Sequence, residues 1–370
     1  MTGLFRNFRS GRFLPESRIF EWGRNLYVYM HTSALNERCR ITGVSALACF
    51  SRSVPKAPAC CFSDLGFPEP LPTSLVVRSF PTPALKGRRR FFSSYTGMER
   101  ANQTTVSSAQ LKYLIVEKLS DAPAVVIIKI NRPNSLNALC LALCDELVQL
   151  LEQLDADDSV RCVVLTGVGE KAFAAGADVK EMQRLDFADI VTSGDLLAKW
   201  ARIHLFRKPI VCAVNAYALG GGCELAMMCD VVIASTQAMF GQPEVRIGTI
   251  PGMGGSQRLP RAVGKSLAME MILTGEPINA ERALQAGLIS RVVPPSHVVD
   301  EAVKIATSIS GHSLPILIAA KECVNRAYEM PLQEGLLFER RLFHGTFAYE
   351  DRKEGMTAFV EKRTPQWHHK

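Results

Sequence analysis

Three consecutive glycines, Gly220 to Gly222, constrain this chain more than any other feature. They follow the apolar run Pro209–Val214 and precede a short apolar stretch that holds one carboxylate, Glu224. Because glycine has no Cβ atom, a ligand can approach the backbone closely there. The stretch Cys223–Cys229 is typical of a buried helix, and the first N–H groups of a helix have no partner within it. The pattern predicts a strand, a glycine turn and a helix whose start can hold an oxygen that gains negative charge.

Glu224 is one helical turn beyond Gly221 and on the same face of the expected helix. Glutamate is almost never fully buried without a partner, so a glutamate among apolar residues is rarely there for packing. One interpretation is a carboxylate that acts on a ligand. The alternative is a glycine-rich turn followed by a glutamate whose head reaches solvent, and a short motif does not decide between them.

The basic character of the chain belongs to its first hundred residues. The net charge of the 370 residues is +7, but residues 1–100 hold 15 Lys or Arg and only 6 Asp or Glu. The remainder holds 28 basic and 30 acidic residues, a net charge of −2. The body therefore gives no general reason to expect a nucleic-acid partner. No apolar run approaches the ~18 residues that span a bilayer, so we expect no membrane insertion.

Residues 1–108 have the composition of an organelle transit peptide, rich in Arg, Ser and Phe and poor in acidic residues. The segment Arg90–Ser94 resembles a cleavage site for a mitochondrial matrix peptidase, so we expect the mature protein in the mitochondrial matrix. The alternative is that translation starts at Met98. In either case we expect residues 1–108 to be disordered and to lie outside the fold.

The cysteines of the body are typical of buried free thiols in a reducing compartment. They include no Cys-x-x-Cys pair, and most have apolar neighbours, so we expect no metal site. The seven are Cys140, Cys144, Cys162, Cys212, Cys223, Cys229 and Cys323.

Apolar runs separated by turn residues predict an α/β core over residues 109–305. The expected strands are 113–118, 125–130, 162–165, 209–214, 230–235 and 238–240, with helices at 141–154 and 190–204. Gly264, Gly275 and Gly287 are typical helix C-terminal stops, and Asn279 is a candidate helix cap. Residues 306–370 are expected to be a helical C-terminal region. The helices expected there and just before it are 297–309, 315–328, 332–347 and 351–363.

A second carboxylate, Glu244, follows the first by twenty residues. It lies at the end of a short strand, with Pro243 before it as a candidate first helical residue. Two glutamates in apolar surroundings suit acid–base chemistry, because burial raises a carboxyl pKa and each charge disfavours ionisation of the other. The alternative is that Glu244 pairs with Arg246 or Arg258 at the surface.

Several stretches spaced along the body match one known family in order. They are residues 131–133, 136–139, 172–182, 218–230, 242–244, 248–252, 261–270 and 351–363. Through them residues 112–365 resemble the crotonase (enoyl-CoA hydratase/isomerase) superfamily, and within it the mitochondrial short-chain enoyl-CoA hydratases. The resemblance implies a spiral of repeated β-β-α units followed by a helical region. It also implies hydration of (2E)-enoyl-CoA thioesters in fatty-acid β-oxidation or branched-chain amino-acid degradation, with coenzyme A as part of the substrate and no other cofactor.

The resemblance also implies the roles of particular residues. The family holds the thioester oxygen with two backbone N–H groups, which match Ala177 and Gly221 here. Its paired glutamates, which orient one water, match Glu224 and Glu244. The residues implied to contact substrate or its CoA part are Ala177, Asp178, Val179, Lys180 and Gly221.

Three further expectations follow from the resemblance. The family is usually a homohexamer, a dimer of trimers, in which the C-terminal helices contact neighbouring subunits. Met253 stands where the family has a small residue, so it bears on the preferred acyl length. The alternatives to hydration are Δ3-to-Δ2 enoyl-CoA isomerisation and an RNA-binding role on the same fold, and the charge of the body weighs against the second.

Overall fold

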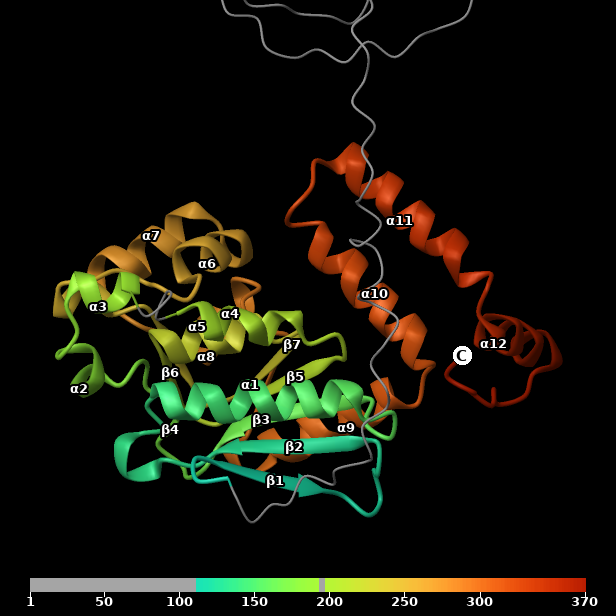
Figure 1. Cartoon of the computed structure of the whole chain (residues 1–370), viewed down its shortest axis with the longest axis horizontal. Coiled ribbons are helices and arrows are strands. Elements are labelled where there is room, and N and C mark those ends of the chain that lie inside the picture. The colour runs from blue at the N-terminus through green and yellow to red at the C-terminus, as the bar shows by residue number, and fades with distance from the viewer. Residues whose placement is uncertain (1–110, 193–196) are drawn as a thin grey trace, which may run out of the picture. The chain divides into compact units, whose positions relative to one another are not determined.

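The computed structural model describes residues 111–192 and 197–370. The expected leader at 1–108, with its cleavage segment and Met98, lies outside the described residues. The described part contains two β-sheets, helices that cover them, and a helical C-terminal region (Figure 1).

The larger sheet has six strands in the order β1-β2-β3-β5-β7-β10. β1 and β2 pair antiparallel, and the other neighbours pair parallel. The strands are β1 (Leu114–Lys118), β2 (Val125–Ile130), β3 (Cys162–Gly167), β5 (Ile210–Val214), β7 (Val231–Ser235) and β10 (Arg291–Val293). Central strands such as β3 and β5 are buried along their whole length, which explains their continuous apolar sequences.

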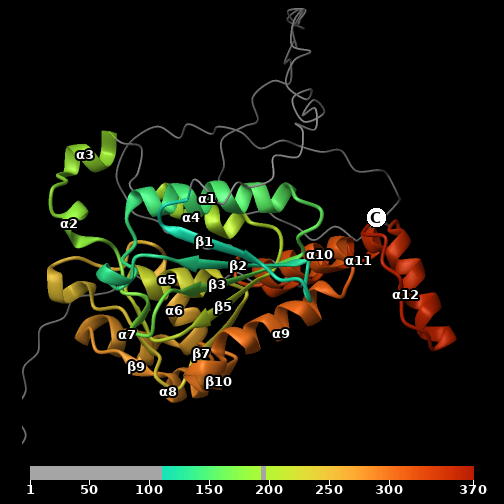
Figure 2. The same cartoon turned by 90° about the horizontal axis from the view of Figure 1, so that it is seen from below.

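Successive residues of these strands face opposite sides of the sheet, and a helix covers each side. Val126 and Ile128 on β2 belong to the core beneath α1 (Leu141–Ala156). Val125 and Ile127 belong to a second core, which α9 (Val298–Ser310) covers with small residues such as Ala302 and Ala306. Figure 2 shows α1 and α9 on opposite sides of the sheet.

The smaller sheet carries the segments that form the candidate site. Its order is β4-β6-β8-β9, with the first three strands parallel. These strands are β4 (Ala172–Ala174), β6 (Tyr217–Leu219), β8 (Met239–Gly241) and β9 (Ile278–Asn279). The α5 helix (Gly221–Met228) follows β6 after a single glycine, and the 3₁₀ helix η4 (Glu244–Ile247) follows β8.

Short helices complete the core. They are η2 (Pro133–Ser135), α2 (Val179–Met182), α3 (Phe187–Thr192), α4 (Ala198–Ala201), η3 (Arg202–Leu205), α6 (Gly255–Val263), α7 (Lys265–Thr274), α8 (Ala280–Gln285) and η5 (Pro295–His297). Gly264 and Gly275 end α6 and α7, and Gly287 follows α8 with a positive φ, as expected. Asn279 caps α8 by accepting the N–H of Arg282, which confirms its predicted role.

The single helix expected at 190–204 is wrong. The structure has the separate elements α3, α4 and η3 there, and residues 193–196 are outside the described part. Trp200 and Ile203 are buried in the core, as their apolar spacing predicted. The residues around them form separate short elements and not one helix.

The helical C-terminal region consists of α10 (Leu314–Arg326), α11 (Leu332–Thr346) and α12 (Glu350–Glu361). It follows α9, which runs across the expected boundary at 305 and packs on the large sheet. In Figures 1 and 2 the three helices extend from one end of the core. A partly exposed ion pair of 2.8 Å between Lys321 on α10 and Asp230 attaches them to it. No single helix in the described residues is long and apolar enough to cross a bilayer. The segment 295–310 and α10 reach that length and apolar character only when they are taken together, and a bend of 111° separates them.

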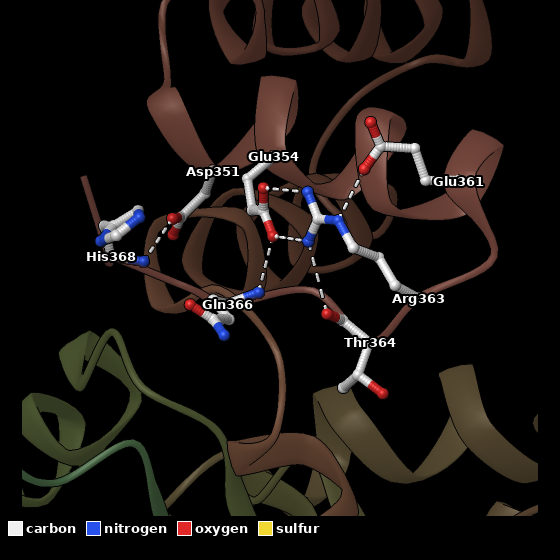
Figure 3. A network of polar contacts seen from close by, with 7 residues as sticks. All are labelled: Asp351, Glu354, Glu361, Arg363, Thr364, Gln366 and His368. Atoms are coloured by element: carbon white, nitrogen blue, oxygen red, sulfur yellow. Dashed lines mark hydrogen bonds and ion pairs between the residues drawn. The ribbon is translucent and has the colours of Figure 1, made fainter.

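After α12 the chain folds back along this helix (Figure 3). The fully buried carboxylate of Asp351 accepts the backbone N–H groups of His368 (2.6 Å) and His369 (2.8 Å). Arg363 contacts Glu354 and Glu361, and the indole N–H of Trp367 donates to the carbonyl of Gly311. The end of the chain is thereby joined to α12 and to the turn between α9 and α10.

Candidate active site

The glycine turn places the start of α5 against β4. Gly220 has φ of 50° and ψ of −125°, a conformation that residues with a side chain rarely adopt. A Cβ atom on Gly222 would lie 2.0 Å from the carbonyl oxygen of Ala174. Only glycine at position 222 permits this approach, and the approach brings Gly221 beside the loop that follows β4.

The backbone amides of Gly221 and Ala177 lie close to each other at this point. The amide nitrogen of Ala177 is 3.5 Å from the position that a Cβ atom would take on Gly221. The loop around Ala177 is fixed by a hydrogen bond from the N–H of Leu139 to the carbonyl of Gly176 and by one from the N–H of Asp178 to the carbonyl of Leu139. Gly221 is the first residue of α5, so its N–H carries the positive end of the helix dipole. The structure therefore brings together the two predicted oxyanion residues.

An ion pair that sequence reasoning missed supports this loop. The guanidinium of Arg132 donates to the carboxylate of Asp178 (2.9 Å) and to the carbonyl of Ala138 (2.5 Å). Asp178 also caps α2 by accepting the N–H of Lys180. The Asn-Arg-Pro stretch at 131–133 matched the family pattern, but nothing in the sequence indicated that Arg132 contacts a residue 46 positions away.

The residues expected to contact CoA lie on the outer side of the same loop. Asp178 is half-buried, Val179 is 50% exposed, and Lys180 is exposed. They belong to the first turn of α2 and its cap. A long polar group can therefore reach the side chain of Lys180 while its other end lies beside Ala177 and Gly221.

Glu224 is 2% exposed, which excludes a glutamate whose head reaches solvent. Its Oε1 atom accepts the backbone N–H of Met253 (2.8 Å) and that of Gly255 (2.6 Å). Burial raises the pKa of Glu224, while these two N–H groups and the charge of Arg258 act in the opposite direction. The carboxylate is thus buried but has donors that favour its ionised form.

Glu244 approaches the glycine turn from η4. Its Oε1 atom lies 2.9 Å from the position of a Cβ on Gly220, and its buried Oε2 atom has no hydrogen-bond partner among the described residues. Burial, together with the charge of Glu224, raises the pKa of Glu244 from its ordinary value of 4.5 to about 7. The surface pairings considered for Glu244 are wrong, because Arg246 pairs with Glu276 and Arg258 binds the carbonyl of Met253.

Gln242 is a second residue whose place in the site the sequence did not indicate. Its side chain is fully buried, and its Nε2 atom donates to the carbonyl of Gly220 (3.5 Å). Its Oε1 atom lies 2.6 Å from the position of a Cβ on Gly255 and has no partner among the described residues. Buried polar atoms are normally hydrogen-bonded, so the free oxygens of Gln242 and Glu244 suit a ligand that donates hydrogen bonds.

A small apolar pocket of about 30 Å³ adjoins Ala177. Its lining residues are Leu139, Leu141, Ala177, Asp178, Glu181, Met182, Leu185, Leu197, Trp200 and Met253. A wider and open hollow of about 410 Å³ lies between residues 133–137 and 168–172. Its lining does not include Glu224, Glu244 or the candidate oxyanion residues Ala177 and Gly221. The small pocket shares Ala177 and Met253 with the site, and most of its lining is apolar.

Comparisons with known proteins identify the family of the chain. Residues 121–370 match the family described as enoyl-CoA hydratase/isomerase. The chain belongs to this family. The chain therefore has the crotonase fold, and the fold expected from the sequence is confirmed.

Individual members of the family are close in sequence. A mitochondrial enoyl-CoA hydratase from Pongo abelii is 55% identical over 257 residues, which cover 70% of this chain and 88% of the relative. A probable mitochondrial enoyl-CoA hydratase from Dictyostelium discoideum is 51% identical over 272 residues, which cover 72% and 98%. Among solved structures, the enoyl-CoA hydratase of Bacillus anthracis is 37% identical with a TM-score of 0.66, and the match covers 70% of this chain and all of that one.

Proposed function

We propose that this protein adds water to (2E)-enoyl-CoA thioesters and forms 3-hydroxyacyl-CoA. The observation that carries the proposal is the approach of the buried Glu224 and the half-buried Glu244 to a glycine turn that also presents the N–H of Gly221 beside that of Ala177. The names of the relatives, which are enoyl-CoA hydratases, support the same reaction.

The two N–H groups stabilise the charge that forms during addition. When water attacks C3 of the enoyl group, electrons move onto the thioester oxygen and give an enolate-like species. Fixed donors at Ala177 and Gly221 bind that oxygen without reorganising. The loss of one such donor typically raises the activation free energy by about 2.7–4 kcal/mol.

The two glutamates differ in their environments, which supports different roles. Glu224 is held by two N–H donors and, in its ionised form, takes a proton from the water that attacks C3. Glu244, whose pKa is about 7, holds a proton near neutral pH and gives it to C2. One proton is taken and one is given, so the resting state returns when a proton passes from Glu224 to Glu244.

Coenzyme A enters as part of the substrate, and we propose no separate cofactor. Lys180, exposed beside Ala177, offers an ammonium group to the phosphates of the CoA moiety, and Asp178 and Val179 contact it from the same loop. The acyl chain lies in the pocket formed by Leu139, Trp200 and their neighbours.

The test is a crotonyl-CoA hydration assay on residues 98–370, with Glu224→Gln and Glu244→Gln beside the wild type. Positioned acid–base groups contribute roughly 10²–10⁴-fold each, so each variant should lose at least about 10²-fold in kcat. Substantial activity in both variants would contradict the assigned roles. A wild type that isomerises 3-enoyl-CoA but does not hydrate crotonyl-CoA would instead favour the isomerase alternative.

We also propose that the protein is a homohexamer assembled through the C-terminal helices. These helices expose large apolar side chains that an isolated subunit would leave in water. They are Val324, Tyr328, Leu332, Leu336, Phe343, Phe347, Met356, Phe359 and Val360. Sedimentation of residues 98–370 should give six subunits, and the double variant Phe343→Ser, Phe359→Ser should give smaller species. A monomeric wild type would contradict the proposal.

The third proposal concerns location in the mitochondrial matrix, where β-oxidation and branched-chain amino-acid degradation supply enoyl-CoA. It rests on the Arg-rich composition of residues 1–108 and on the mitochondrial relatives, although bacterial relatives are also similar. Residues 1–110 fused to a fluorescent protein should direct it to mitochondria. A diffuse signal would favour Met98 as the start.

A further inference from the structure

Within residues 111–192 and 197–370, Glu224 is held by a short loop and not by another side chain. The loop runs from Met253 to Gly255, just before and at the start of α6, and two of its N–H groups donate to one carboxylate oxygen. The position of that oxygen therefore depends on the conformation of three residues. Gly254, in the middle, has φ of 104°, so the loop is not one that most residues would form without support.

Arg258 supplies that support at two points. Its Nη1 atom donates to the carbonyl of Met253 (2.8 Å), and its backbone N–H donates to the carbonyl of Gly254 (2.7 Å). A Cβ atom on Gly254 would lie 2.1 Å from Nη1, so the guanidinium lies directly over this glycine. The same residue thus binds the carbonyls of Met253 and Gly254, and the second of these belongs to the peptide unit that carries the donor N–H of Gly255.

The charge of Arg258 also acts on the site. The guanidinium is half-buried, and the acidic groups that act on it are Glu224 and Glu329. The charge of Arg258 favours the ionised form of Glu224. The other titratable groups near Glu224 are Glu244 on η4 and the thiol of Cys223. Burial opposes ionisation of Glu224, and the positive charge of Arg258 favours it.

We propose that Arg258 is a positioning residue, which holds the 253–255 loop in its donating conformation and keeps Glu224 ionised while Glu244 carries the proton. The proposal rests on the hydratase function and on the role of Glu224 given above. Arg258 does not touch the reacting atoms in this scheme. It acts through the backbone carbonyls of Met253 and Gly254 and through its charge.

The experiment compares Arg258→Gln, Arg258→Lys and the control Arg261→Gln in crotonyl-CoA hydration across pH 5 to 9. Arg261 lies one turn further along α6, is exposed, and also donates to a backbone carbonyl, that of Gln257. Arg258→Gln should lower kcat by about 10- to 100-fold, since a small displacement of a catalytic group has that effect, while KM changes little. The acidic limb of the kcat/KM profile should move to higher pH, because Glu224 loses the cation that favours its charge. Arg258→Lys should restore the position of that limb and only part of kcat.

A double-mutant cycle separates positioning from general stability. In a Glu224→Gln background, Arg258→Gln should cost little further activity, because the group that it positions is already gone. Equal losses in both backgrounds, or an unmoved acidic limb, would overturn the proposal. Thermal unfolding and sedimentation of each variant verify that it is folded and assembled. A wild type without hydratase activity would refute the proposed function, whereas an active wild type with unaffected Arg258 variants would refute only the role of Arg258.

Discussion

The backbone N–H of Gly255 donates a hydrogen bond of 2.6 Å to Oε1 of Glu224, which joins the start of α6 to α5. The residue at 255 has no room for a side chain. A Cβ atom there would lie 2.6 Å from Oε1 of Gln242 and 2.9 Å from Oε1 of Glu224. The site is therefore closed around this glycine from two sides.

We predict that Gly255→Ala displaces the carboxylate of Glu224 and lowers kcat by roughly 10²-fold, as expected for a shift of about 1 Å in a catalytic group. The measurement is kcat and KM for crotonyl-CoA. Gly335→Ala on α11 is the matched control, because its added Cβ would meet no atom within 4 Å. A Gly255→Ala enzyme with wild-type kcat would show that Glu224 does not depend on this contact.

The raised pKa of Glu244 predicts a pH-dependent change in stability. Between its ordinary value of 4.5 and about 7, the folded protein retains a proton that the unfolded chain releases. The native state therefore loses stability as the pH rises through this window. Because Gln does not ionise, Glu244→Gln should gain thermal stability relative to the wild type between pH 5 and pH 8. A difference in Tm that is constant over this range would contradict the raised pKa.

Met253 is expected to limit the length of the acyl chain. It is 7% exposed, lines the small pocket, and its sulfur lies 3.3 Å from the position of a Cβ on Gly221. Met253→Ala should raise the ratio of kcat/KM for a C10 substrate over a C4 substrate roughly tenfold, which is within the range that a change in pocket volume produces. Met269→Ala, at an exposed position on α7, is the control. An unchanged ratio would place the limit on chain length elsewhere.

Asp351 is predicted to hold the end of the chain in place. Burial opposes its ionisation, but the N–H groups of His368 and His369 favour it, and the net effect is a lowered pKa. Asp351→Asn replaces one acceptor oxygen with an amide group that cannot accept, which should cost about 1–3 kcal/mol in the free energy of unfolding. The stabilising effect of Asp351 should be present near pH 7 and lost as the pH falls through its lowered pKa. Urea unfolding of both proteins at pH 7 and pH 2 measures this, and equal stabilities at pH 7 would contradict it.

Local patterns predicted most of the fold. The continuous apolar runs of β3 and β5, the spacing of leucines in α1 and the glycines that end α6 and α7 each have a local physical cause, and the structure agrees with them. The region from 190 to 204 differed because Trp200 and Ile203 satisfy the same apolar spacing in a broken segment.

The site was predicted only in part. Glycine spacing led to Gly221 and Glu224, and the apolar surroundings of Glu224 and Glu244 led to their joint acid–base role, whereas Ala177 came from the family resemblance. The supports of the site act across long separations in the chain. Gly255 is 31 residues from Glu224, and a spacing pattern within one segment contains no signal for such a contact. The two glutamates also differ in their hydrogen bonds to backbone N–H groups. Nearly every residue has such a group, so the sequence does not indicate which ones will donate to Glu224.

The folded-back chain end has a practical consequence for preparing the protein. The carbonyl of Lys370 accepts the N–H of Asp351, and the ring of His369 accepts the N–H of Leu314, at the start of α10. A purification handle fused directly after Lys370 would have to leave from a residue that is already bound to α12. A handle placed before residue 111 leaves these contacts intact and is the better choice for assembly and stability measurements.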